Sequence, residues 1–90
     1  MDAKKIRKLH RRIEQLRQRK ANVRARELAS IARSLGRFPK NKGKEPCFEK
    51  SGRTPLTIPN HPGEMSPITV DSILETLETD LFYEEELGNA

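Results

Sequence analysis

Residues 55–74 have the sequence PLTIPNHPGEMSPITVDSIL, in which the hydrophobic period changes from two to about 3.6 residues. Leu56 and Ile58 alternate with polar neighbours, as in a strand that buries one face. Pro67 suits the first position of a helix. The apolar stripe that follows at helical spacing consists of Val70, Ile73, Leu74, Leu77 and Leu81, with the acidic residues, Asp80 among them, off this stripe. The stretch therefore predicts a strand, a proline-rich loop and a helix.

Residues 37–60 contain four prolines and two glycines, which exclude a helix there. Short strands are predicted at about 37–41, 46–50 and 55–59, with a hairpin turn between the last two. Pro39 makes the first of them an edge or irregular strand, because proline has no N–H to donate to a neighbouring strand.

Two helices are predicted before the strands, at residues 3–21 and roughly 25–35, with a break near Asn22. The first carries an apolar seam of Ile6, Leu9, Ile13 and Leu16, and the second an apolar stripe of Leu28, Ile31, Ala32 and Leu35. Gly36 suits a left-handed cap after the second helix. The order helix, helix, three strands, helix predicts a small α+β fold.

The chain has 90 residues, enough for one small domain, and a single Cys, which excludes an internal disulfide. No apolar run approaches the ~20 residues of a membrane span, so we expect a soluble cytoplasmic protein without a membrane partner. No glycine-rich phosphate loop is present, and one Cys and two distant His do not give zinc-ligand spacing. We therefore expect no metal and no cofactor, and Cys47 is interpreted as a core thiol rather than a nucleophile.

The net charge of +5 is unevenly distributed. Residues 1–24 hold ten Lys or Arg and two acids, whereas residues 54–90 hold eight acids and no Lys or Arg. A polyanion partner such as RNA would explain the basic half, because cations release counterions from phosphates. Pairing between the basic and acidic ends of the chain would explain it equally well.

The segment TIPNHPGE at residues 57–64 is followed by Ser66-Pro67 and by TVDSIL at residues 69–74. Together these segments resemble the HicA family of toxin ribonucleases. That family ends with a strand of the form T-[IV]-P-x-H-P-G, then a helix entered by P-x-T and containing S-I-L. Weaker matches upstream, in the same order, are the helix from Glu27 to Leu35 with Gly36, then Lys42-Gly43, then Phe48.

The resemblance implies an α-β-β-β-α domain, similar to double-stranded-RNA-binding folds, over residues 25–83. Residues 1–24 are then a basic helical extension, and residues 84–90 an acidic, frayed tail. It also implies a toxin of a type II toxin–antitoxin pair, which cleaves messenger RNA and is blocked by a HicB-like antitoxin. One departure is the residue after the first strand, where Glu45 stands in place of the family's catalytic His.

Metal-free RNA cleavage needs a base for the 2′-hydroxyl proton and an acid for the leaving 5′-oxygen. The candidate catalytic residues are Glu45 and His61. The candidate phosphate-binding residues are Arg37, Lys40, Lys42, Lys44, Lys50 and Arg53. Three alternatives stay open: Glu45 is the base, assisted by Lys44 or His61; other residues cleave; or the protein binds RNA without cutting it. The alternative role for His61, which we favour over catalysis, is to fix the proline-bracketed turn by hydrogen bonds.

The rival hypothesis is a non-catalytic module that binds RNA or protein through the basic helix, with the HicA-like domain as its scaffold. A structural subunit of a heterodimer is a third. The apolar seam of helix 3–21 needs a cover in every case. The cover is either the chain's own helices or the same helix of a second copy. We favour the second copy, because residues 25–78 already match the family's length.

Overall fold

The computed structural model describes residues 2–40, 46–59 and 65–88, and within these residues it contains three α-helices and one three-stranded antiparallel sheet. The elements in chain order are α1 (Ala3–Gln18), a 3-10 turn (Lys20–Asn22), α2 (Ala25–Ser34), β1 (Phe38–Lys40), β2 (Cys47–Glu49), β3 (Leu56–Thr57) and α3 (Pro67–Gly88). The predicted α+β class and order of elements are confirmed. No described helix is long and apolar enough to cross a membrane.

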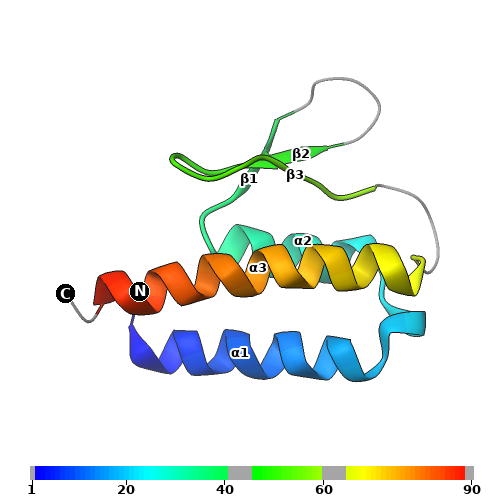
Figure 1. The fold of residues 1–90 in the computed structure, drawn as a ribbon, viewed down its shortest axis with the longest axis horizontal. Helices are drawn as coiled ribbons and strands as arrows, with labels where there is room; N and C mark the ends of the chain where they lie inside the picture. Colours follow the sequence, from blue (N-terminus) through cyan, green and yellow to red (C-terminus); the bar gives the residue numbers. More distant parts are fainter. Residues whose placement is uncertain (1, 41–45, 60–64, 89–90) are drawn as a thin grey trace.

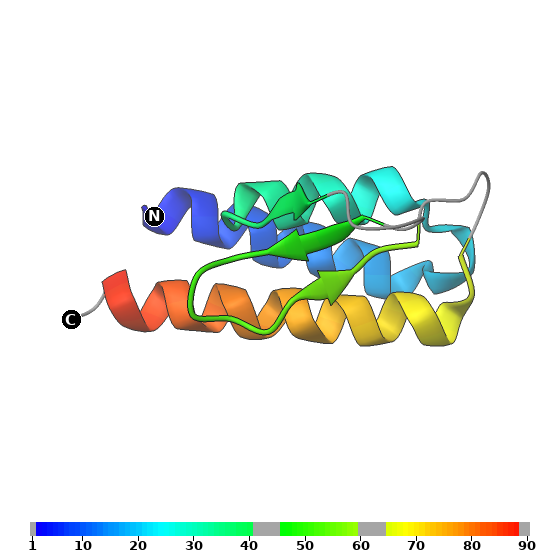
Figure 2. The ribbon, with the colours of Figure 1, turned by 90° about the horizontal axis from the view of Figure 1, so that it is seen from above.

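The elements form three layers (Figures 1 and 2). The sheet, with strand order β1-β2-β3, lies over α2 and α3, and α1 lies on the other side of these two helices. In the sheet Lys40 is opposite Cys47, and Cys47 is also opposite Thr57. The end of β1, the start of β2 and the end of β3 therefore meet at one end of the sheet.

The helix ends follow local hydrogen bonds. The carboxylate of Asp2 accepts the Lys5 N–H at 2.8 Å and begins α1. The helix ends at Gln18 and continues as the 3-10 turn to Asn22, so the predicted helix 3–21 is shorter and the break near Asn22 is confirmed. After α2, Gly36 adopts φ +86°, the left-handed conformation predicted for it.

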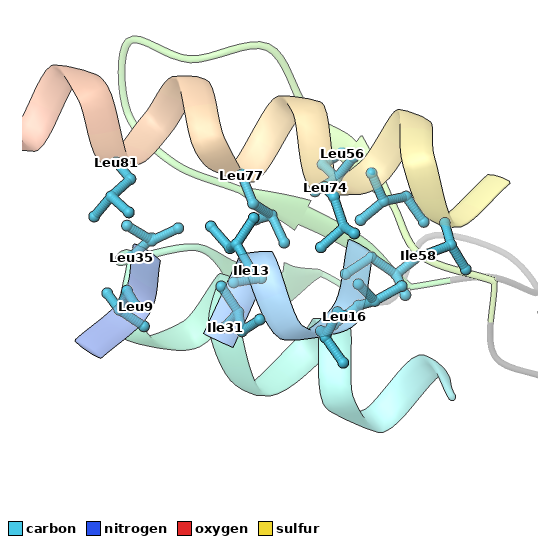
Figure 3. Close-up of a cluster of buried hydrophobic side chains, with 14 of the residues drawn as sticks. Leu9, Ile13, Leu16, Ile31, Leu35, Leu56, Ile58, Leu74, Leu77 and Leu81 are labelled. Carbon is cyan, nitrogen blue, oxygen red and sulfur yellow. The ribbon is translucent and has the colours of Figure 1, made fainter. Parts of the chain in front are cut away.

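The apolar seam of α1 is buried inside its own chain. Ile6, Leu9, Ile13 and Leu16 are 1–6% exposed and belong to the same core as the apolar faces of α2 and α3. Figure 3 shows three of the four, Leu9, Ile13 and Leu16, in one cluster with side chains of those helices. The cover is therefore intramolecular, and our preference for a second copy as the cover of this seam is wrong.

Two other expectations are corrected. α3 continues to Gly88, so residues 84–88, which we expected to be frayed, are helical. Cys47 is half-buried rather than a core residue, because the buried Phe48 faces the helices and its strand neighbours point the other way.

Candidate nucleic-acid interface

Four of the predicted site residues, Glu45, His61, Lys42 and Lys44, lie outside the residues that the structure describes. Described residues that flank these undescribed segments are in contact with each other. The Ile58 N–H donates to the carbonyl of Pro46 at 3.3 Å. The residue that follows Glu45 is therefore hydrogen-bonded to a residue three positions before His61.

Arg37 was predicted to hold an RNA phosphate and is instead a buried structural cation. Its side chain is 1% exposed and pairs with the carboxylate of Asp80. Nη2 donates to Oδ1 of Asp80 at 3.1 Å, and Nη1 donates to the carbonyls of Phe48 at 3.1 Å and Thr54 at 2.9 Å. The guanidinium is thus directed into the protein, because it joins β2 and the following turn to α3. The prediction for Arg37 is corrected on these grounds.

Arg53 and Lys50 are held by α3 as well. Nε of Arg53 donates to Oδ1 of Asp80 at 3.0 Å, and its guanidinium lies 4.1 Å from the ring centroid of Tyr83. Nζ of Lys50 donates to the Leu35 carbonyl and to Oε1 of Glu84, both at 2.6 Å. Both side chains are only about a fifth exposed, at 21% and 22%. These two cations therefore join the turn after β2 to α3, and Lys50 also joins it to the end of α2.

Lys40 remains at the surface. Its side chain is 63% exposed, and its Nζ is 3.9 Å from the Glu49 carboxylate. Such an exposed ion pair is weak and leaves the ammonium available to an external anion. Lys40 also lies at the end of the sheet where β1 ends and β2 begins.

A hollow of about 420 Å³ opens between α2 and this end of the sheet. It is lined by Ala25, Arg26, Ala29, Arg33, Pro39, Pro46, Phe48 and Ile58. Its lining is apolar apart from two exposed arginines of α2, Arg26 and Arg33, and the guanidinium of Arg33 lies 6.0 Å from the Phe48 ring centroid. Neither arginine is among the predicted site residues, although their spacing of seven residues places them on one side of a helix.

Asp80 has a structural role that was not predicted. The side chain of Asp80 is fully buried between Arg37 and Arg53. Position 80 is three residues after Leu77 and seven after Ile73, so it lies on the apolar stripe of α3, and our placement of Asp80 off this stripe is wrong. An acid at a core position requires a buried cation, and this signal could have been found in the sequence.

The acidic helix α3 pairs with the basic helix α1 and with the 3-10 turn that follows α1. Arg17 Nη1 donates to Glu78 at 2.8 Å, and Lys20 Nζ is 3.1 Å from Asp71. His10 Nε2 is 3.0 Å from Glu85. Internal pairing therefore accounts for much of the acidic charge of α3.

The outward face of α1, unlike the side that faces α3, carries cations without an ion-pair partner. Its exposed cations are Lys4, Lys5, Arg7, Lys8 and Arg11, and none of them has an acidic partner within residues 2–40, 46–59 and 65–88. Beside them an open hollow of about 390 Å³ is lined by Asp2, Lys4, Lys5, Lys8, Leu9, Arg12 and Ser34. Arg12 Nη2 donates to Ser30 Oγ at 3.2 Å. We call the five exposed cations the α1 basic face.

No group of three or more His, Cys, Asp or Glu that could hold a metal occurs in the described part of the chain. Comparison of the chain with models of protein families, with curated proteins and with solved structures finds no match in any of the three.

Proposed function

We propose that this protein is a HicA-like toxin that binds RNA and cleaves it. The observation that carries the proposal is the register of the sheet. Because Lys40 is opposite Cys47 and Cys47 is opposite Thr57, the chain enters residues 41–45 and residues 60–64 from the same end of the sheet. The residues singled out by the resemblance to HicA therefore belong to two segments that follow strands on either side of β2, at the same end of the sheet.

The described residues next to these two segments are hydrogen-bonded to each other. Glu45 precedes Pro46 directly, and His61 follows Ile58 by three residues. The Ile58 N–H donates to the Pro46 carbonyl at 3.3 Å. This supports a site in which Glu45 and His61 act on one RNA phosphodiester.

The proposed chemistry assigns one group to each proton. The carboxylate of Glu45 accepts the proton of the 2′-hydroxyl, which then attacks the adjacent phosphorus. His61 donates a proton to the leaving 5′-oxygen. The products are a 2′,3′-cyclic phosphate and a 5′-hydroxyl, so neither oxidant nor metal is required for the balance of the reaction.

The hollow beside this end of the sheet supports RNA as the substrate. The ring of Phe48 and the side chain of Ile58 give it an apolar floor, and Arg26 and Arg33 supply positive charge at its rim. An apolar wall with nearby guanidinium groups fits a nucleotide, because the base packs on the wall and the phosphate pairs with arginine. Lys40, Lys42 and Lys44 complete the proposed phosphate contacts.

The resemblance further suggests the substrate class and the partner. We assign messenger RNA as the substrate and a HicB-like antitoxin as the protein that blocks the site. The finer description of residues 25–83 as a double-stranded-RNA-binding-like fold belongs to the same proposal. Its support is the order α2, β1, β2, β3, α3 and the antiparallel pairing of the strands.

The test is cleavage of RNA by the purified protein in the presence of EDTA. Glu45→Gln and His61→Ala should each slow cleavage by roughly 10²-fold or more, because each removes a proton-transfer group. Glu49→Gln is the matched control, since it makes the same change in a carboxylate on β2 and should cleave normally. Equal cleavage by all four proteins would remove the assignment of Glu45 and His61.

A second candidate function is RNA binding without cleavage. The observation that favours it is the α1 basic face, which belongs to a helix outside the segment that resembles HicA. A wild-type protein that binds RNA with salt-dependent affinity but leaves it intact would establish this function.

A further inference from the structure

We propose that the α1 basic face is a second RNA-binding surface, which holds the phosphate backbone on the side of the molecule opposite the sheet. The inference rests on the proposed function in one respect: RNA is taken as the polyanion that binds. It adds a surface that the resemblance to HicA does not imply, because the resembling segment begins at about residue 25.

The cations of the α1 basic face form no ion pair with a described residue. The acids nearest to them in sequence are Asp2, which lines the hollow beside Lys4, Lys5 and Lys8, and Glu14, which is exposed on α1. Elsewhere in the described chain, cations that approach α3 are paired: Arg17 with Glu78, Lys20 with Asp71, Lys50 with Glu84. The five cations of the α1 basic face have no such partner among the described residues, and all five are exposed. Among the described residues, these five cations therefore form a patch of positive charge that no ion pair compensates.

The spacing of these cations fits a phosphate backbone. Lys4, Lys8 and Arg11 lie at i, i+4 and i+7 and so on one side of α1. At 1.5 Å per residue the row is about 10 Å long. One strand of a duplex places a phosphate every ~3.4 Å along its axis, so the row spans on the order of three phosphates.

The same face is poorly suited to other acidic partners. Among the described residues, the exposed large hydrophobic ones are Phe38, Ile68, Phe82, Tyr83 and Leu87, and none of them is on α1. A membrane-surface helix needs apolar anchors, and the centre of a protein interface is enriched in aromatic residues and depleted of lysine. Binding to phosphates needs only positive charge, so RNA is the occupant that the surface fits best.

The layer arrangement separates this surface from the proposed cleavage site. Figure 1 shows α1 and the sheet on opposite sides of α2 and α3. A cation of α1 therefore cannot contact the phosphodiester that is being cut at the sheet. The α1 basic face should lower the KM for long RNA and leave kcat unchanged.

The test compares two variants that change the net charge equally. Lys4→Ala/Lys8→Ala removes two positive charges from α1. Ser72→Glu/Thr79→Glu adds two negative charges on α3. The probe is a short, fluorescein-labelled, single-stranded RNA with 2′-O-methyl riboses, which cannot be cleaved through the 2′-oxygen. Its affinity is measured by anisotropy over a range of salt concentrations, and circular dichroism checks that both variants are folded.

We expect the α1 variant to bind at least about tenfold more weakly in ~0.1 M salt, with a log–log salt slope reduced by about 1.4, or ~0.7 for each phosphate that is no longer neutralised. The α3 control should keep the wild-type slope. Equal weakening of both variants would show that only net charge matters and would overturn the proposal, as would an α1 variant that binds like the wild type. Binding of the wild type to anionic vesicles but not to RNA would also overturn it.

A cleavage assay separates this proposal from the proposed function. An α1 variant that cleaves RNA with normal kcat and raised KM supports both. Normal KM and kcat in that variant would refute the α1 surface and leave the HicA-like function standing. Weakened RNA binding by the variant, with no cleavage by the wild type, would refute the nuclease and support the α1 surface.

Discussion

The contact between the sheet and α3 depends on one buried carboxylate, and its replacement should be severely destabilising. Asp80→Asn keeps the shape of the side chain and removes the charge that faces Arg37 and Arg53. Removing one partner of a buried ion pair costs about 3–5 kcal/mol, because the other charge stays buried without compensation. A domain of this length has a total stability of roughly 5–13 kcal/mol. The substitution should therefore remove a large fraction of the free energy of unfolding.

Urea unfolding followed by circular dichroism measures this effect. With an m-value of ~1.5 kcal/mol/M, a destabilisation of about 4 kcal/mol lowers the unfolding midpoint by nearly 3 M. Glu75→Gln is the control, because Glu75 is exposed on the same helix, and its cost should be within about 0.5 kcal/mol. A midpoint for Asp80→Asn within about 0.5 M of the wild type would refute the assignment of Asp80 as the centre of this contact.

A double-mutant cycle tests whether Asp80 acts through Arg37. Arg37→Met and Asp80→Leu should each be strongly destabilising, whereas the double variant should cost at least ~2 kcal/mol less than the sum of the two. The reason is that the double variant buries no unpaired charge of this pair. Additive costs would mean that the two side chains do not depend on each other.

Three further predictions concern the helices. Ile13→Ala should cost about 2–5 kcal/mol in urea unfolding, because Ile13 is 1% exposed within the core; a cost below about 1 kcal/mol would contradict the burial of the α1 seam. Gly36→Ala should cost about 1–2 kcal/mol in thermal unfolding from its positive φ, since a Cβ there would meet only ordinary contacts with Lys50; an unchanged melting temperature would refute this. Hydrogen bonding and charge from Arg19 lower the pKa of Glu27 below its ordinary 4.5, so the stability advantage of the wild type over Glu27→Gln should be full above pH 4.5 and lost as the pH falls through the lowered value; a pH-independent difference in unfolding free energy would be inconsistent with the pair.

Periodicity in the sequence is sufficient to locate the helices and their buried faces. Ile13 and Leu77 are both predicted to lie on apolar faces, and both are in the core. The strands are shorter than predicted, because prolines such as Pro55 and Pro59 cannot donate to a neighbouring strand. The partner of the α1 seam could not be predicted, since an apolar stripe indicates burial without indicating what covers it.

The candidate site is harder to predict, because the sequence does not show which cations are buried in ion pairs and which are exposed to bind a ligand. Arg37 and Lys40 are three residues apart in a basic segment, yet one is buried and the other is exposed. The difference arises from Asp80, which is distant in sequence and meets Arg37 only in the folded chain. Helical periodicity could have placed Asp80 on the core side of α3, but the identity of its cation depends on the tertiary structure.

The central claim is that this protein cleaves RNA through the ribose 2′-oxygen, without a metal. The most direct measurement compares two labelled strands of identical sequence, one of ordinary RNA and one with 2′-O-methyl riboses, incubated with the purified protein in excess EDTA. Both strands should be bound, and only the ordinary RNA should be cut, leaving 2′,3′-cyclic phosphate ends. Intact ordinary RNA, or cleavage of both strands, would contradict the claim.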